Sequence, residues 1–487
     1  MVGRGAFYIM LARIAFVLSG YILHVSMAHL LTPADYGSLG VVLGLITLWR
    51  VFLSAGVPQT TTRFIAADPG QTHGIWRKAL GVQAAGALAL WALYVASTPV
   101  WVWLLNDPSL TPYILLSSFL IPLMAWYQVN LAYYAGRMQF GVQAGMISLY
   151  SIARVAVAVP LVIAGLGIGG VVLGITLAAL LVAALTHAGV RRESPDGGSV
   201  PAWREMVAFS LPLIAVSFGI SALLNLDLLL LKHFFPASEI VGYYNGAANL
   251  GKAPYWVLSA FATTALPSVA AALGSKDAEG ARTLVQRHVS YVLLISLPAV
   301  ALVLPSARQL LVLVYPEPYG AAAGALALLV GSGSALALLT VLTSAITAAG
   351  KPRVSMAIVL ACTVLQCFAG IVLVPRYGML GAATANLTTV LCGVAVAGWV
   401  VRARFGGVVE TGRLLKAAGL SSLLGLALWL WPDYPPLALP LLYVVGLLLY
   451  GGGMVVLGGL APSELERVRR LLRRPGTRPP AETSTGN

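Results

Sequence analysis

Long apolar stretches separated by short polar turns repeat along the whole chain of 487 residues. Each stretch has about 20 residues or more, the length an α-helix needs to cross ~30 Å of hydrocarbon. No segment shows the alternation over about 10 residues that is typical of an outer-membrane β-barrel. The pattern predicts an all-α polytopic membrane protein with about 14 transmembrane helices. The expected spans are 7–30, 38–62, 79–104, 111–135, 141–164, 167–190, 208–231, 242–271, 286–304, 320–349, 354–374, 379–401, 415–431 and 437–460.

Composition supports the same class. Hydrophobic residues make up 59% of the chain and charged residues only 9%, with a mean hydropathy of +0.87, which excludes an ordinary soluble globular protein. The three cysteines, Cys362, Cys367 and Cys392, all fall in expected spans. We interpret them as small packing residues and expect neither a disulfide nor a metal site.

The distribution of basic residues predicts the topology. The net charge is +14, and most lysines and arginines fall on one set of alternate loops and on the termini. The opposite set holds only Lys232, Arg308 and Arg376. This positive-inside bias predicts a multi-pass protein of the cell (cytoplasmic or inner) membrane with both termini in the cytoplasm. The excess charge therefore indicates contact with anionic membrane lipids and argues against nucleic acid as a partner.

The order of the spans suggests four regions. We expect an N-terminal lobe of six helices at 1–203, a C-terminal lobe of helices seven to twelve at 204–405, two additional helices at 406–461, and a basic cytoplasmic tail at 462–487. The turn from His29 to Gly37 is echoed by the turn from His233 to Gly242. A six-helix unit used twice would give two pseudo-symmetric lobes around a central cavity. Chance similarity of turn residues is the alternative.

Four basic side chains lie in the middle of apolar spans: Arg13, Arg50, Arg154 and Lys252. Each costs ~2.5 to 3.5 kcal/mol at a bilayer centre, so we expect these groups to face water, a partner or an anionic ligand. A structural pair or a snorkelling side chain is the alternative for any one of them. Asp227 is the only carboxylate in an expected span, and one acid cannot neutralise four bases. The group therefore predicts a transported anion.

Helical spacing gathers polar residues into stripes on three of the spans. If these stripes converge, they form a positive, partly dehydrated pocket in which attraction to phosphate is strong. The stripes are Arg13 and His24 in the first span; Thr47, Arg50 and Ser54 in the second; and Asn245, Asn249 and Lys252 in the eighth.

Asp227 is the candidate for cation coupling. An intramembrane carboxylate can take up a proton or, with neighbouring amides and hydroxyls, a sodium ion. The neighbours we expect are Asn225, Gln366, Thr384, Asn386 and Thr388. An ion pair between Asp227 and Lys252 or another base is the alternative. Beyond a coupling H⁺ or Na⁺, the sequence predicts no cofactor and no metal centre.

Several short motifs of the sequence resemble those of one transporter family. They are Leu31-Thr-Pro-Ala-Asp35-Tyr-Gly, Ala55-Gly-Val-Pro58, Thr62-Arg63-Phe-Ile-Ala, Asp227-Leu-Leu-Leu-Leu, Val241-Gly-Tyr-Tyr, Ala349-Gly-Lys-Pro-Arg353 and Pro375-Arg-Tyr-Gly-Met-Leu-Gly. Their order resembles oligosaccharide flippases, the polysaccharide biosynthesis branch of the superfamily that also holds multidrug/toxin extruders and the lipid II flippase. The resemblance covers the chain to about residue 460.

The resemblance implies a function and roles for particular residues. It implies that the protein is not an enzyme and carries a polyprenyl-diphosphate-linked oligosaccharide between membrane leaflets by alternating access. Arg13, Arg50 and Lys252 stand where that family's lipid II branch contacts pyrophosphate, and Asp227 stands at its coupling position. The companion acid of the eleventh helix has no counterpart here, which favours a proton over sodium. Glycosyltransferases or a glycan polymerase would be partners.

Two other functions compete with this interpretation. A multidrug extruder shares the predicted architecture, but a pump for cationic drugs would need a negative or apolar cavity. A membrane glycan polymerase or ligase would need an extramembrane site for chemistry, usually on a large outward loop, and the sequence predicts none.

Overall fold

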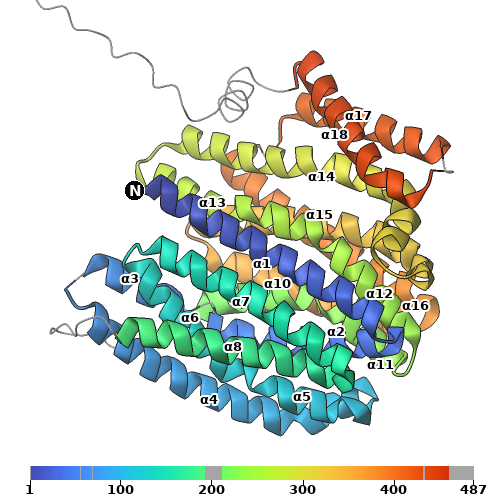
Figure 1. The fold of residues 1–487 in the computed structure, drawn as a ribbon. Coiled ribbons are helices and arrows are strands. Elements are labelled where there is room, and N and C mark those ends of the chain that lie inside the picture. The colour runs from blue at the N-terminus through green and yellow to red at the C-terminus, as the bar shows by residue number, and fades with distance from the viewer. Residues whose placement is uncertain are drawn as a thin grey trace, which may run out of the picture.

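The computed structural model describes residues 2–54, 56–68, 70–191, 211–407, 409–431 and 434–459. This part of the chain is helical throughout and contains no strand. Its long helices lie side by side across the molecule (Figure 1). The lobe boundary expected at residue 203 and the tail expected at 462–487 lie outside the described residues.

The helices follow the order of the expected spans. The first group comprises α1 (Val2–Leu30), α2 (Pro33–Ser54), α3 (Val57–Ala67), α4 (Thr72–Leu105), η1 (Pro108–Leu110), α5 (Thr111–Ser118), α6 (Leu120–Gly136), α7 (Phe140–Leu161), η2 (Val162–Leu166) and α8 (Gly167–Arg191). The second group comprises α10 (Leu211–Leu223), α11 (Leu226–Phe234), α12 (Glu239–Gly251), α13 (Ala253–Gly274), α14 (Ala278–Val314), η3 (Glu317–Ala322), α15 (Ala323–Ala348) and α16 (Pro352–Phe405). The last helices are α17 (Thr411–Leu430), η4 (Pro436–Ala438) and α18 (Leu439–Val456).

Eleven helical runs of the described residues are long and apolar enough to cross a membrane, and α10 with α11 forms a twelfth that is bent by 47°. Two of the runs turn back on themselves. Gly165 has φ 91° between α7 and α8, which pack together. Gly378 has φ 53° inside α16, and a Cβ on Gly393 would lie 2.6 Å from the sulfur of Cys362, on the opposite side of that turn. Counting each hairpin as two spans confirms the expected all-α polytopic fold.

Contacts divide the helices into two groups. In the first, α1 packs on α7, and α8 packs on α6 and α7; in the second, α15 packs on α13, α14 and α16. Helix α17 packs on α14, so the last two helices lie on the outside of the second group (Figure 1). The groups touch through α2 with α10, α11 and α12, through α1 with α12, and through α4 with α11.

The two groups meet most tightly at the end of the molecule that carries residues 31–32, 106–107 and 235–238, which we name the closed end. A Cβ on Gly37 would come within 2.7 Å of the backbone nitrogen of Gly242. A Cβ on Gly242 would overlap the carbonyl oxygen of Pro33. Glycine at both positions therefore lets α2 and α12 approach backbone to backbone. These are the two segments whose sequences echo each other.

Span seven is broken in its middle. Helix α10 ends at Leu223 and α11 begins at Leu226, which leaves carbonyl groups without helical partners. The amide of Asn386 donates to the Leu223 carbonyl at 2.8 Å, and that of Gln366 lies 3.5 Å from the same oxygen. Side chains of α16 thus satisfy the break, as a membrane interior requires.

Candidate functional site

A hydrogen-bonded cluster joins three helices between the groups. The Tyr36 hydroxyl on α2 lies 3.3 Å from Nδ1 of His24 on α1. The amide of Asn249 on α12 lies 3.3 Å from both of these atoms. Asn245, one turn earlier, donates to the Tyr36 carbonyl at 3.0 Å. The structure thus brings together all three residues expected to line a polar cavity, His24, Asn245 and Asn249, and adds Tyr36.

Three bases lie on the same helix faces, farther from the closed end. Lys252 follows Asn245 by seven positions, two helical turns. Arg13 precedes His24 by eleven positions, which returns to nearly the same direction about 16 Å along α1. Arg50 similarly follows Tyr36 along α2, about four turns away. Helical spacing therefore places these bases on the same faces of α1, α2 and α12 as the cluster.

None of these three bases forms an ion pair with a described acid, although the charge of Asp227 acts on Lys252. Arg13 is exposed, and Arg50 and Lys252 are partly buried. The described ion pairs involve other residues, and the Nε of Arg50 is buried without a hydrogen-bond partner. Unpaired nitrogen donors of this kind form strong, charge-assisted hydrogen bonds with phosphate or carboxylate oxygens. The arrangement can bind an anion.

Arg154 on α7 is placed differently. Its Nη2 donates to the Phe16 carbonyl at 2.5 Å and to the Ser19 hydroxyl at 2.6 Å, and its Nε donates to the same hydroxyl at 3.2 Å. The guanidinium also lies 4.4 Å from the centre of the Phe16 ring. Its place in an apolar span predicted that Arg154 binds the anion with the other bases, but in the structure its Nε and Nη2 are bonded to α1. Its main effect is to hold α1 against α7.

The positive charges reinforce one another. The charge of Arg50 acts on Arg154, and the charges of Lys252 and Arg154 both act on His24. In a poorly solvated region such repulsion is weakly screened. An anion entering this space is attracted by all of them together.

Asp227 lies near the break in span seven. Its side chain is only 3% exposed. The Tyr244 hydroxyl donates to Oδ2 at 2.7 Å, and the backbone nitrogen of Leu228 donates to Oδ1 at 2.9 Å. The field of Lys252 reaches Asp227, but no ion pair between the two forms among the described residues. Asp227 is therefore a buried carboxyl group with a tyrosine as its side-chain partner.

The expected neighbours of Asp227 are engaged elsewhere or not bonded to it. Asn225 donates to the Ser221 carbonyl at 2.7 Å, Asn386 binds the Leu223 carbonyl and Ser332, and no hydrogen bond links Thr384 to Asp227. Asn386 is bonded away from Asp227 because the break in span seven frees the Leu223 carbonyl, which accepts from the Asn386 amide. Periodicity gave no signal for that break.

In the part of the chain the structure describes, no group of three or more His, Cys, Asp or Glu side chains could hold a metal ion. The three cysteines are free.

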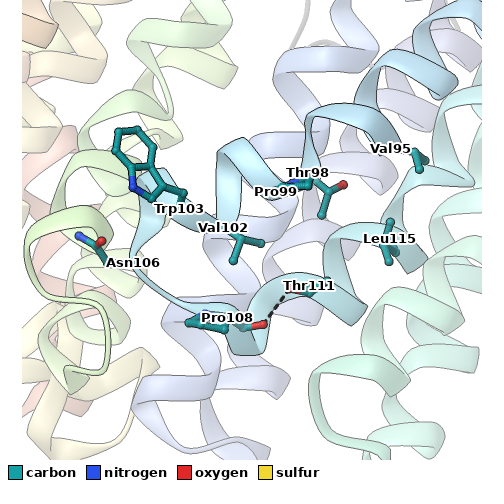
Figure 2. Close-up of a pocket in the computed structure, with 9 residues that line it drawn as sticks. All are labelled: Val95, Thr98, Pro99, Val102, Trp103, Asn106, Pro108, Thr111 and Leu115. Carbon is teal, nitrogen blue, oxygen red and sulfur yellow. Dashed lines mark hydrogen bonds between the residues drawn. The ribbon is translucent and has the colours of Figure 1, made fainter.

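A groove of about 650 Å³ lies elsewhere, on the flank of the first group. Figure 2 shows its lining from α4, η1 and α5. The lining is mainly apolar and contains none of the four bases. The residues are Val95, Thr98, Pro99, Val102, Trp103, Asn106, Pro108, Thr111 and Leu115. The groove is therefore separate from the anion-binding arrangement.

Comparisons with known proteins give a family and a fold. The family model described as "Polysaccharide biosynthesis protein" matches residues 26–324. The lipid II flippase MurJ in an inward closed conformation superposes with a TM-score of 0.71 at 12% identity, over 96% of this chain and 99% of that chain. An inward-facing multidrug resistance MATE family transporter of the MOP superfamily gives 0.64 at 14%, over 81% and 98%.

A third similar structure is a MOP superfamily transporter from Pyrococcus furiosus, described as having a binding pocket of reverse polarity. It superposes with a TM-score of 0.59 at 15% identity, over 82% of this chain and 96% of that chain. No curated protein matches the sequence. At these identities the likeness establishes the fold.

Proposed function

Because the chain belongs to the polysaccharide biosynthesis protein family, whose model matches more than half of it, we propose that it flips a lipid-linked oligosaccharide across the cytoplasmic membrane. The cargo class is a glycan on a polyprenyl diphosphate. The proposal is supported by three bases, Arg13, Arg50 and Lys252, that lie on the same helix faces as the polar cluster and form no ion pair in the described part of the chain.

The chemistry of this cargo fits the three bases. A diphosphate carries negative charge and many acceptor oxygens, and hydrogen bonds to charged groups contribute ~1.5 to 3 kcal/mol each. Arg50 supplies a planar guanidinium and Lys252 a compact point charge. The glycan would occupy the hydrated space between the groups while the prenyl chain stays in lipid. Arg154 contributes positive charge and keeps α1 in place.

The two helix groups act as the two lobes of an alternating-access carrier. The charge bias of the loops assigns the closed end to the outside and both termini to the cytoplasm. The diphosphate then enters from the cytoplasmic side and leaves when the closed end opens. Glycosyltransferases would supply the cargo, and a glycan polymerase would act on it after transport; the protein itself is a carrier and no enzyme.

Asp227 is the proposed coupling group, and the proposed ion is a proton. Its partner Tyr244 is a neutral hydroxyl, and its expected sodium-binding neighbours are bonded elsewhere. A buried carboxyl group that forms no ion pair can exchange a proton during the cycle. Holding a sodium ion would need several more oxygen ligands, and the expected ones are bonded elsewhere.

Surface-glycan export tests the function directly. In cells lacking their own flippase, the wild-type protein should restore export, whereas Arg50→Ala and Lys252→Ala should each reduce it by about tenfold or more, because each removes a charged contact. Arg376→Ala, at an exposed arginine, is the matched control. Full export by both variants, at wild-type levels of membrane protein, would refute the proposal.

A multidrug extruder is the second candidate, because the MATE transporters share the fold. The unneutralised bases oppose it for cationic drugs, since like charges repel in a poorly screened site. Drug-susceptibility assays in a strain without its own pumps separate the two functions. Resistance to cationic drugs without any effect on glycan export would favour the extruder.

A further inference from the structure

A buried lysine at the closed end joins the two helix groups. Lys232 of α11 is only 2% exposed. Its ammonium lies 2.6 Å from Oδ2 of Asp107 and donates to the Ser38 hydroxyl at 3.0 Å. It also donates to the Pro236 carbonyl of its own group. One cation of the second group is thus bound to two separate elements of the first, the α4–η1 turn and α2. The proposed anion site uses none of these residues.

A second set of contacts flanks this ion pair. The amide of Asn106 donates to the His233 carbonyl at 3.1 Å, and the His233 ring is hydrogen-bonded to the Leu104 carbonyl. Asn106 ends α4 in the left-handed conformation, with φ 52°, and so turns the chain into Asp107. Figure 2 shows Asn106 at the margin of the groove, beside the light-green ribbon of the second group.

The Asp107 carboxylate is oriented for this contact. Its Oδ1 accepts from the backbone nitrogen of Ser109 at 3.0 Å and from the Ser109 hydroxyl at 2.5 Å, which leaves Oδ2 for Lys232. Burial by itself raises the pKa of Asp107, but the hydrogen bonds from Lys232 and Ser109 outweigh it and the pKa lies below its usual value. The Asp107 carboxyl group is therefore ionised at neutral pH.

We infer that Lys232, Asp107 and Ser38 form a latch that holds the closed end shut and must separate each time cargo leaves at that end. This inference rests on the alternating access of the proposed function. The energetics suit a contact that is made and broken repeatedly. The attraction within a buried ion pair is largely offset by the loss of hydration, so separation, which returns both groups to water, carries a small net cost.

Removing one partner has a different effect from separating both. Asp107→Asn keeps the shape and an acceptor for Ser109 but leaves the Lys232 ammonium buried without a counter-charge, which is costly in the closed state. Lys232→Met leaves Asp107, whose side chain is 16% exposed, with partial access to water. Asp107→Asn should therefore open the closed end more than Lys232→Met does. The double variant leaves no buried charge and should open less than Asp107→Asn alone.

Electron-paramagnetic-resonance distances across the closed end test this. Spin labels at Leu115→Cys on α5 and Ala237→Cys before α12 report on the two groups, in full-length protein in nanodiscs without cargo, with the native cysteines replaced. We expect a dominant short distance in the otherwise wild-type protein. Asp107→Asn should raise the ratio of long to short distances by at least about tenfold, with a smaller rise for Lys232→Met.

Arg308→Met is the matched control. It breaks an ion pair of 2.8 Å with Glu317 that is exposed and lies within the second group, so the distances should not change. If either charge variant cannot be purified folded, Ser38→Ala, which removes one acceptor and leaves no charge unpaired, should still give a measurable rise. Unchanged distances in the folded latch variants, or an equal rise with Arg308→Met, would overturn the inference. Because no cargo is present, this outcome is independent of whether Arg50 and Lys252 bind a diphosphate.

Discussion

Lys252 illustrates what the sequence can and cannot say about a single residue. Its position in an apolar run, in register with Asn245 and Asn249, predicted a polar face, and the structure places both asparagines with His24. Tyr36 escaped notice because aromatic residues near span ends are common anchors. Arg154 was grouped with the anion-binding bases because spacing reveals a buried charge but not its partners, here Phe16 and Ser19.

Asp227 gives the prediction that belongs to the residue scale. In proteoliposomes with the membrane potential clamped, an imposed pH gradient should raise the rate of transport by the wild-type protein. Asp227→Asn keeps the shape and can still bind Tyr244 but cannot exchange a proton, so transport should fall to the rate seen without a gradient. Glu279→Gln, at an exposed acid, should behave as wild type. A full response to the gradient in Asp227→Asn would assign coupling elsewhere.

At the scale of elements, hydropathy predicted every span but not the breaks within them. The reason is that a break depends on partners from other helices, as Asn386 and Gln366 show at the end of α10. For the same reason Lys232 was counted with the loops opposite the basic side, whereas the structure buries it between the groups. Residues distant in sequence therefore decide both where span seven breaks and whether Lys232 is buried.

The close approach of α2 to α12 predicts opposite effects on the melting temperature when alanine replaces Gly81 or Gly242. Alanine favours a helix over glycine by ~1 kcal/mol, so Gly81→Ala in α4, where a Cβ meets nothing within 4 Å, should leave thermal stability unchanged or higher. Gly242→Ala would overlap the Pro33 carbonyl, and such overpacking costs ~1 to 3 kcal/mol. The melting temperature of the purified protein should therefore fall. An unchanged melting temperature for Gly242→Ala would mean that the groups do not pack this closely.

At the scale of the whole molecule, the interface between the two groups differs along its length. The close packing of α2 on α12 at Gly37 lies next to the cluster of His24, Tyr36 and Asn249, while Arg13, Arg50 and Lys252 lie farther from the closed end. Under the proposed function the anionic cargo would also have a favoured direction, since moving one negative charge out of an inside-negative cell releases ~2.3 kcal/mol of free energy per 100 mV. The family and the architecture were predictable from ordered motifs and apolar runs. The identity of the cargo could not be predicted, because neither hydropathy nor helical spacing depends on it.

The central claim is that the bases between the groups select the diphosphate of a lipid-linked glycan. Flipping measured in proteoliposomes tests it most directly, with one fluorescent polyprenyl-linked oligosaccharide prepared in two forms, a diphosphate and an uncharged ether. We expect the wild-type protein to flip the diphosphate only, and the Arg50→Ala/Lys252→Ala double variant to flip neither form. Equal flipping of both forms, or undiminished flipping of the diphosphate by the double variant, would contradict the account.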